Sequence, residues 1–282
     1  MIVRWTAYAV VLLGVQAWGW TQSPVTSPTG LAHIALRVSD VDREVDFLSK
    51  LGFEEAFANA DNGRTTQAFV KVNDRQFIEV YPATASGETA GSLGLMHVCY
   101  EVADLKALND RYAVDGLKPT SWRKAGAGNL LFNLQDPDGR VTEFTQYMPG
   151  SRQMNDVGQH LGAHRVSDEL IGFEMPVVDM KTARKFYEAM GFSARQEGAN
   201  LRLELASNPD IQIVLTDAGK GTLPQLFFAV DDARRAEDEL EKAGLHGTRE
   251  KKRVTVRDPG GNIFVLIENG DGRSGRTIRA KR

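Results

Sequence analysis

Cysteine is almost absent from this sequence, which contains only Cys99 among 282 residues. One cysteine excludes an intrachain disulfide, so the fold must be stable without one. An excess of charge of one sign is also lacking, since 34 lysines and arginines stand against 37 aspartates and glutamates. The formal net charge of −3 gives no electrostatic reason to expect nucleic acid as a partner. What is present is 42% hydrophobic residues, enough for a globular protein with a sizeable core.

A long apolar run is lacking as well. The run "AYAVVLLGV" at 7–15 is too short to cross a bilayer comfortably. Arg4 precedes it, and Ala17 and Gly19 follow at the −3 and −1 spacing of a cleavage site. Residues 1–19 are therefore predicted to be a signal peptide, which implies a periplasmic or secreted protein with no stable membrane association after cleavage. An uncleaved membrane anchor is the alternative.

Two further segments are predicted to lie outside the folded part of the chain. Residues 20–30 are rich in Ser, Thr and Pro, which is typical of a flexible linker. Residues 269–282 are basic and are predicted to be a solvated, frayed tail.

The sequence repeats itself at an offset of 64 residues. This offset superposes a histidine, a valine, an aspartate, a glycine and a glutamate on the same residue types: His33/His97, Val38/Val102, Asp40/Asp104, Gly52/Gly116 and Glu79/Glu143. Each copy thus holds a histidine and a glutamate separated by 46 residues. Internal repetition of this kind indicates duplicated structural units.

A second repeat relates the two large halves of the chain. An offset of 139 carries Asp40, Phe47, Gly52 and Phe53 onto residues of the same types at 179, 186, 191 and 192. Four related units follow, at 31–82, 93–148, 170–217 and 223–268. We expect two domains, a metal-binding one at 31–148 and a degenerate one at 170–268, joined by a connector at 149–169.

The pattern within one unit predicts the order β-α-β-β-β. Residues 33–38, "HIALRV", alternate as a strand, and Asp40 can cap a helix that Gly52 ends. "QAFVKV" at 67–72 and "QFIEVYP" at 76–82 are strands rich in β-branched and aromatic residues.

Strand alternation sends His33 to the face of the sheet opposite the helix, and it does the same for Glu79, His97 and Glu143. Should two units pair about a pseudo-two-fold axis, these four side chains would share one cleft. Two imidazoles and two carboxylates suit one divalent ion such as Zn²⁺, Ni²⁺, Mn²⁺ or Fe²⁺. An isolated histidine or glutamate on a strand is more often structural, but repetition at one spacing favours the metal site.

The second half serves as an internal control for this interpretation. Carried across to the matching strands of the third and fourth units, the four candidate ligands fall on residues that bind metal poorly: Gly172, Val214, Gln225 and Val265. The histidines are therefore not needed for the fold itself, and 170–268 is expected to keep the fold without a metal.

These segments resemble the vicinal oxygen chelate superfamily, which includes glyoxalase I, bleomycin-resistance proteins and extradiol dioxygenases. The resemblance rests on "HIALRVSDVDREVDFLSKLGF", the Glu of "FIEVYP", the His of "MHVCYEV" and "DPDGRVTEF". It implies an α+β fold in which four βαβββ modules pair as two glyoxalase-like domains with cupped mixed sheets.

The strongest resemblance is to glyoxalase I. It implies metal ligation by His33, Glu79, His97 and Glu143, and binding of the anionic part of a small-molecule substrate by Arg37. It also implies that a glutamate moves a proton through an enediolate, with Glu143 ranked before Glu79.

Two other functions remain open. An Fe²⁺ extradiol dioxygenase would use only His33, His97 and Glu143, and Tyr81 and Tyr147 would suit its phenolic substrate or simply line a pocket. Glu79 argues against it, as does the position of the other histidines (His160, His164 and His246) away from the repeated strands. A non-catalytic protein that binds a small molecule is the other alternative. Arg37 has a structural alternative too, an ion pair with Glu101, and Cys99 is assigned no chemistry.

Overall fold

The computed structural model describes residues 27–83, 93–221 and 223–269. It contains two eight-stranded mixed sheets built from βαβββ modules, so the predicted α+β fold is confirmed. The predicted signal peptide and the tail beyond residue 269 lie outside the described residues. The linker was predicted to extend to residue 30, but the first strand already begins at Pro28, because Pro28 and Gly30 pair with Val102 and Glu101.

The first sheet combines two modules. The first module comprises β1 (Pro28–Val38), α1 (Val41–Lys50), β2 (Glu54–Asp61), β3 (Arg64–Asn73) and β4 (Gln76–Pro82). The second comprises β5 (Gly94–Val102), α2 (Leu105–Val114), β6 (Arg123–Lys124), β7 (Leu130–Gln135) and β8 (Val141–Gln146). The strand order is β2-β3-β4-β1-β5-β8-β7-β6, so β1 and β5 form an antiparallel pair at the centre, flanked by β4 and β8 in parallel.

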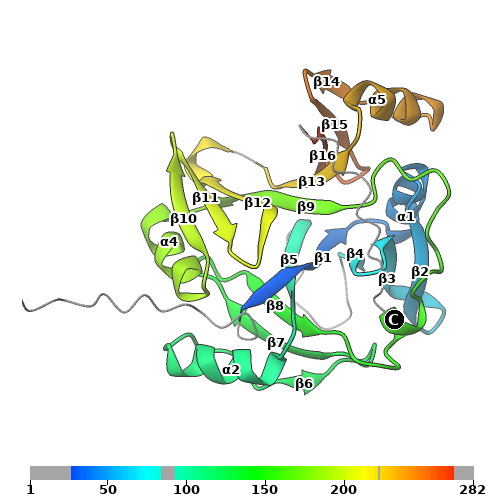
Figure 1. Cartoon of the computed structure of the whole chain (residues 1–282). Coiled ribbons are helices and arrows are strands. Elements are labelled where there is room, and N and C mark those ends of the chain that lie inside the picture. Colours follow the sequence, from blue (N-terminus) through cyan, green and yellow to red (C-terminus); the bar gives the residue numbers. More distant parts are fainter. Residues whose placement is uncertain (1–26, 84–92, 222, 270–282) are drawn as a thin grey trace, which may run out of the picture.

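The second sheet repeats this arrangement after a short helix, α3 (Arg152–Asn155). The third module comprises β9 (Leu170–Val177), α4 (Met180–Ala189), β10 (Ser193–Glu197), β11 (Asn200–Leu205), β12 (Asn208–Asp217) and the short 3₁₀ helix η2 (Ala218–Lys220). The fourth comprises β13 (Gln225–Val230), α5 (Ala233–Lys242), β14 (Thr248–Glu250), β15 (Arg253–Arg257) and β16 (Ile263–Glu268). Figure 1 shows α2 and α5 at opposite ends of the molecule.

The predicted helix signals act as expected in the first module. The Asp40 carboxylate accepts a hydrogen bond from the Arg43 N–H at 3.0 Å and so caps α1. Gly52 ends the helix with φ of +82°, and a side chain there would meet the His164 carbonyl at 2.5 Å. Asp104 caps α2 in the same way.

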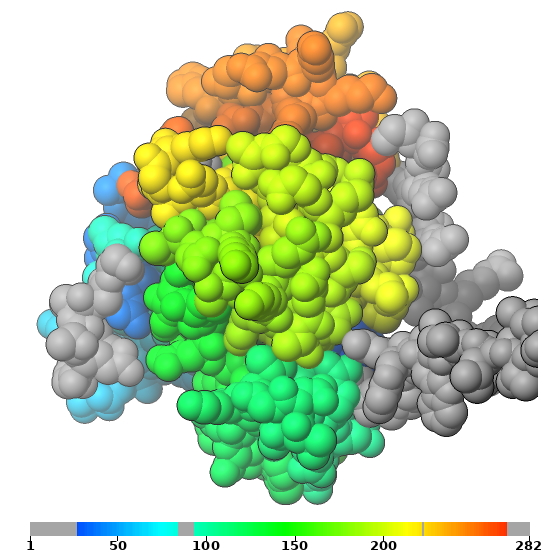
Figure 2. Space-filling model, turned by 90° about the vertical axis from the view of Figure 1, so that its left-hand side faces the viewer, coloured from blue at the N-terminus to red at the C-terminus, as the bar shows by residue number. Residues whose placement is uncertain are grey.

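One apolar core connects the two sheets. Aromatic rings meet across them in three places, with centroids 5.3–5.6 Å apart: Phe47 with Phe264, Phe53 with Phe228, and Tyr100 with Phe192. Figure 2 shows the third module (yellow-green) between the second module (green) and the fourth (orange), in contact with both. The first and fourth modules are joined by Phe47, and the second and third by Tyr100. This packing fixes the position of β1 and β5.

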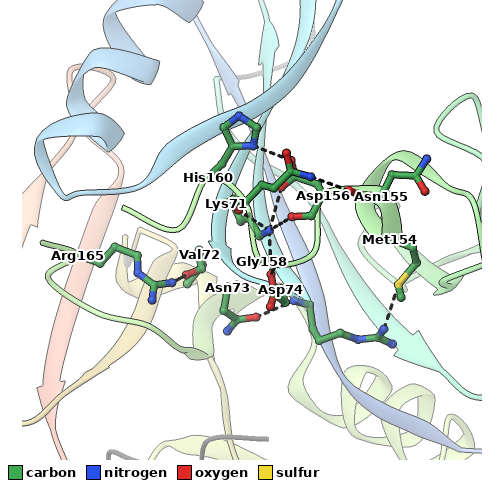
Figure 3. A network of polar contacts seen from close by, with 12 residues as sticks. Lys71, Val72, Asn73, Asp74, Met154, Asn155, Asp156, Gly158, His160 and Arg165 are labelled. Atoms are coloured by element: carbon green, nitrogen blue, oxygen red, sulfur yellow. Dashed lines mark hydrogen bonds and ion pairs between the residues drawn. The ribbon is translucent and has the colours of Figure 1, made fainter. Parts of the chain in front are cut away.

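The segment between the sheets packs closely on the first sheet, around one buried cation. Lys71 on β3 is fully buried, and its ammonium group donates to the carbonyls of Asp156 and Gln159. The same group lies 2.9 Å from a carboxylate oxygen of Asp156 and 2.9 Å from one of Asp74 (Figure 3). His160 contacts the other Asp156 oxygen at 2.6 Å, which gives it a structural partner far from the repeated strands.

Candidate metal centre

The central strands bring the two repeated histidines together. On β1, Ala35 pairs with Glu79 of β4 on one side and with His97 of β5 on the other. On β5, Cys99 pairs with Glu143 of β8 and with His33 of β1. The site therefore has pseudo-two-fold symmetry. Ala35 and Cys99 each lie between a glutamate on one neighbouring strand and a histidine on the other. This is the convergence that strand alternation predicts.

The distances are those of a compact donor cluster. The Nε2 atoms of His33 and His97 are 3.0 Å apart. His33 Nδ1 lies 3.4 Å from Glu79 Oε1, and His33 Nε2 lies 3.5 Å from Glu143 Oε1. Two imidazole nitrogens bound to one ion at about 2.1 Å and at a right angle would be about 3.0 Å apart, which matches the histidine pair. Within the described residues, two overlapping triads have donor atoms within 4.8 Å of one another: His33–Glu79–His97 and His33–Cys99–Glu143.

Burial controls the charge state of this cluster. His33 and His97 are 6% and 7% exposed, and burial lowers the pKa of each imidazole to about 3, so both are neutral and able to bind a metal. Burial raises the pKa of Glu79, and burial together with the Glu79 charge raises the pKa of Glu143 to about 8. Two buried carboxyl groups this close together repel one another when ionised, and a divalent cation would compensate both. The donor set therefore fits such an ion.

A second layer of contacts orients Glu79. Gln67 on β3 donates its amide N–H to Glu79 Oε2 at 2.8 Å, and the Tyr81 hydroxyl donates to the same oxygen at 2.9 Å. Oε1 is left facing His33. The sequence interpretation assigned Tyr81 to substrate and did not identify Gln67. The signal for Gln67 was weak, since a glutamine on a strand is common and its partner lies 12 residues away.

The other predicted substrate residues lie near the cluster with protein partners of their own. Arg37 stands opposite Tyr81 in the β1–β4 register, and its Nη2 lies 3.6 Å from the Met96 sulfur. The Tyr147 hydroxyl donates to the Arg75 carbonyl at 2.9 Å. Glu101, the acid considered as a partner of Arg37, pairs with Arg75.

The second sheet has the same registers without the ligands. Gly172 pairs with Gln212 on β12, and a side chain at Gly172 would lie 1.9 Å from the Gln212 carbonyl. The equivalent of Cys99 is Phe227, which pairs with Gly172 and Val265. A separate apolar cluster forms here from Ile171, Phe227, Ala229, Ile263 and Val265, with Val214 packed against it. Hydrophobic packing thus replaces the polar cluster.

Residues 30–144 match the Glyoxalase/Bleomycin resistance protein/Dioxygenase superfamily. The matched residues cover most of the first sheet. A relative with 25% identity over 139 residues is the glyoxalase domain-containing protein RDO1 of Mycosarcoma maydis; the match covers 48% of this chain and 78% of RDO1.

Among solved structures, two examples share the fold of this chain over most of both chains. One is the 2,3-dioxygenase LapB from Pseudomonas sp. KL28, with a TM-score of 0.63 and 16% identity over 88% of this chain and 94% of that chain. The other is the Mn(II)-bound glyoxalase from Novosphingobium aromaticivorans, with a TM-score of 0.63 and 16% identity over 86% of this chain and 82% of that chain. At such identity the likeness concerns the fold alone. Among the described residues, no helix has the length and apolar character required to span a membrane.

Proposed function

We propose that this protein is a divalent-metal-dependent enzyme whose ion binds two neighbouring oxygens of a small molecule. His33, Glu79, His97 and Glu143 would hold the ion. The observation that carries the proposal is the pair of Nε2 atoms 3.0 Å apart, with Glu79 and Glu143 against the two sides of His33. Neutral imidazoles and carboxylates in this number are ligands for borderline and hard divalent ions such as Zn²⁺, Ni²⁺, Mn²⁺ or Fe²⁺.

For the reaction, ring cleavage of a catechol-like substrate is our first candidate. It is supported by the four-module fold that this chain shares with a 2,3-dioxygenase over 88% of its length. His33, His97 and Glu143 would be the two histidine ligands and one carboxylate ligand of an Fe²⁺ ion. An Fe²⁺ ion held by these three residues would have positions open for dioxygen and substrate. The chain's own contribution would come from Tyr81 and Arg37, which stand opposite one another in register and would orient an anionic phenol. This departs from the sequence interpretation, which ranked glyoxalase chemistry first.

The second candidate is glyoxalase-like proton transfer on a 2-hydroxycarbonyl compound. Two observations favour it. Glu79 is a fourth donor that a dioxygenase would not require, and the Glu143 carboxyl lies in the donor cluster, 3.5 Å from His33 Nε2, where it could accept a proton from a substrate bound there. Glu143 would then be the base, with Glu79 held in place by Gln67 and Tyr81.

Metal analysis tests the proposal. Protein purified without chelator should contain about one ion per chain, and His33→Ala or His97→Ala should lose it. Gln225→Ala, at the matching register position of the second sheet, should retain it and is the control. Stoichiometric metal in both histidine variants would overturn the site.

Two assays separate the reactions. Oxygen consumption with catechols by the Fe²⁺-loaded protein supports ring cleavage. Exchange of a substrate C–H proton with solvent deuterium under anaerobic Zn²⁺ or Ni²⁺ supports the glyoxalase-like reaction. Ligand binding with neither activity supports a binding protein of the bleomycin-resistance type.

We also propose that the protein is exported, on the basis of residues 1–19 alone. Amino-terminal sequencing of the protein recovered from the cells that make it should then start just after Gly19. An intact Met1 on the membrane-bound protein would support the anchor instead.

A further inference from the structure

The pseudo-symmetry of the metal centre is broken at one position. Ala35 and Cys99 are equivalent, since each pairs with a glutamate-bearing strand on one side and a histidine-bearing strand on the other. Ala35 contributes a methyl group, which has no donor atom. Cys99 contributes a sulfur at the corresponding place, between His33 and Glu143. The half of the cluster around Cys99 therefore has three donor side chains, and the half around Ala35 has only two, those of His97 and Glu79.

The sulfur of Cys99 is directed into this cluster. Cys99 is fully buried, and its Sγ, a nitrogen of His33 and an oxygen of Glu143 lie within 4.8 Å of one another. The thiol also forms a side-chain hydrogen bond with Glu143. Its backbone contact is weak, with Sγ 3.8 Å from the Tyr100 carbonyl. The strongest polar neighbours of the sulfur are thus the proposed metal ligands.

We propose that Cys99 Sγ is a further ligand of the ion, supplied next to His33 and Glu143. This inference rests on the proposed metal site. When the ion binds, the thiol releases its proton to the buffer and the sulfur donates an electron pair to the ion, as happens for coordinating thiols generally. A thiolate is a soft ligand, so it favours Zn²⁺ and Co²⁺ over Mn²⁺. Cys99 would therefore determine which metal the site selects.

Cobalt substitution tests the proposal directly, because thiolate bound to Co²⁺ gives an intense near-ultraviolet charge-transfer band that nitrogen and oxygen ligands do not give. The chain has a single cysteine, so a thiolate band has only one source. We expect the band in the wild-type protein titrated with Co²⁺ and its loss in Cys99→Ser and Cys99→Ala. Both variants should keep the weaker visible bands of Co²⁺ bound by His33 and His97. Cys99→Ala reproduces the side chain of the symmetry-related position and is well suited to a buried site.

Competition between metals gives a second readout. Removing the sulfur should reduce the preference for Zn²⁺ over Mn²⁺ by about tenfold or more, measured from dissociation constants of wild type and Cys99→Ala. Visible cobalt bands without the near-ultraviolet band in the wild type would overturn the role of Cys99 and leave the metal site intact. Absence of both sets of bands would overturn the metal site together with this inference.

Discussion

Glu44 on α1 lies against Asp258, in the turn between β15 and β16, across the junction of the two sheets. Glu44 is 1% exposed, and burial, followed by the nearby charge of Asp258, raises the pKa of its carboxyl to about 9. At the matching junction between the second and third modules, Asp136 is instead paired with Arg140 at 3.1 Å. Asn262 takes the place of that arginine in the turn of Asp258. The first and fourth modules therefore meet through two acids, whereas the equivalent acid of the second module is paired with an arginine of its own turn.

This contact predicts a pH dependence of stability. The folded protein keeps a proton on Glu44 that the unfolded chain, with an ordinary pKa near 4.5, has released. Stability should therefore fall as pH rises between about 4.5 and 9, by at most about 1.4 kcal/mol per pH unit from this group. Glu44→Gln keeps a neutral side chain at every pH and should remove that part of the slope. Urea unfolding of wild type and variant at pH 5, 7 and 9 measures the difference, and Glu55→Gln on the exposed surface of β2 is the control. Parallel slopes for wild type and Glu44→Gln would contradict the prediction.

Lys71 should be among the most sensitive positions outside the core. Lys71→Met leaves the Asp156 carboxylate, whose side chain is 8% exposed, without its lysine, and it removes a donor from the carbonyls of Asp156 and Gln159. We expect a loss of about 3–5 kcal/mol in the free energy of unfolding. Lys50→Met breaks a pair with Asp46 in which the side chains are 45% and 64% exposed, and should cost less than about 1 kcal/mol. Equal effects of the two substitutions, measured by urea unfolding, would be inconsistent with this role of Lys71.

Tyr81 and Tyr147 should differ in their effect on metal affinity. Tyr81→Phe removes a hydrogen bond to the proposed ligand Glu79, and such supporting contacts typically contribute about 10- to 100-fold to metal affinity. Tyr147→Phe removes a hydrogen bond to a backbone carbonyl and should change metal affinity little. Zn²⁺ titration by calorimetry of the two variants makes the comparison. A larger loss for Tyr147→Phe would contradict the assignment.

Gly172 should not tolerate even a methyl group. A Cβ there would lie 1.9 Å from the Gln212 carbonyl, so β9 and β12 would have to separate. Gly172→Ala is expected to cost about 3 kcal/mol or more, whereas Gly126→Ala, which meets no atom within 4 Å, should cost much less. Thermal unfolding of both variants checks this. It also follows that histidine cannot be restored at this position without rebuilding the strand pair.

Much of the centre could be predicted because it follows from short-range periodicity. The alternation of strand residues and a repeated spacing of 46 residues were enough to select His33, Glu79, His97 and Glu143. The same rules predicted the module order and the cap at Asp40, because these depend on neighbours in sequence.

Contacts between distant segments could not be predicted in this way. Gln67 and Lys71 both lie on β3, and nothing local distinguishes the one that supports Glu79 from the one that binds the segment around Asp156. Glu44 looks like an ordinary solvent-facing helix residue, and its burial is due to the fourth module. The order of the candidate reactions could not be predicted either, because the same donor residues fit both a dioxygenase and a glyoxalase-like enzyme.

The central pairing of β1 with β5 has one more consequence. His33 and Glu79 belong to the first module, and His97 and Glu143 belong to the second. An ion held by all four would connect the two modules through coordination bonds, in a chain whose lone cysteine permits no intrachain disulfide. Chelation should then loosen the first sheet selectively, with faster amide hydrogen exchange along β1 and β5 and no change along β9 and β13.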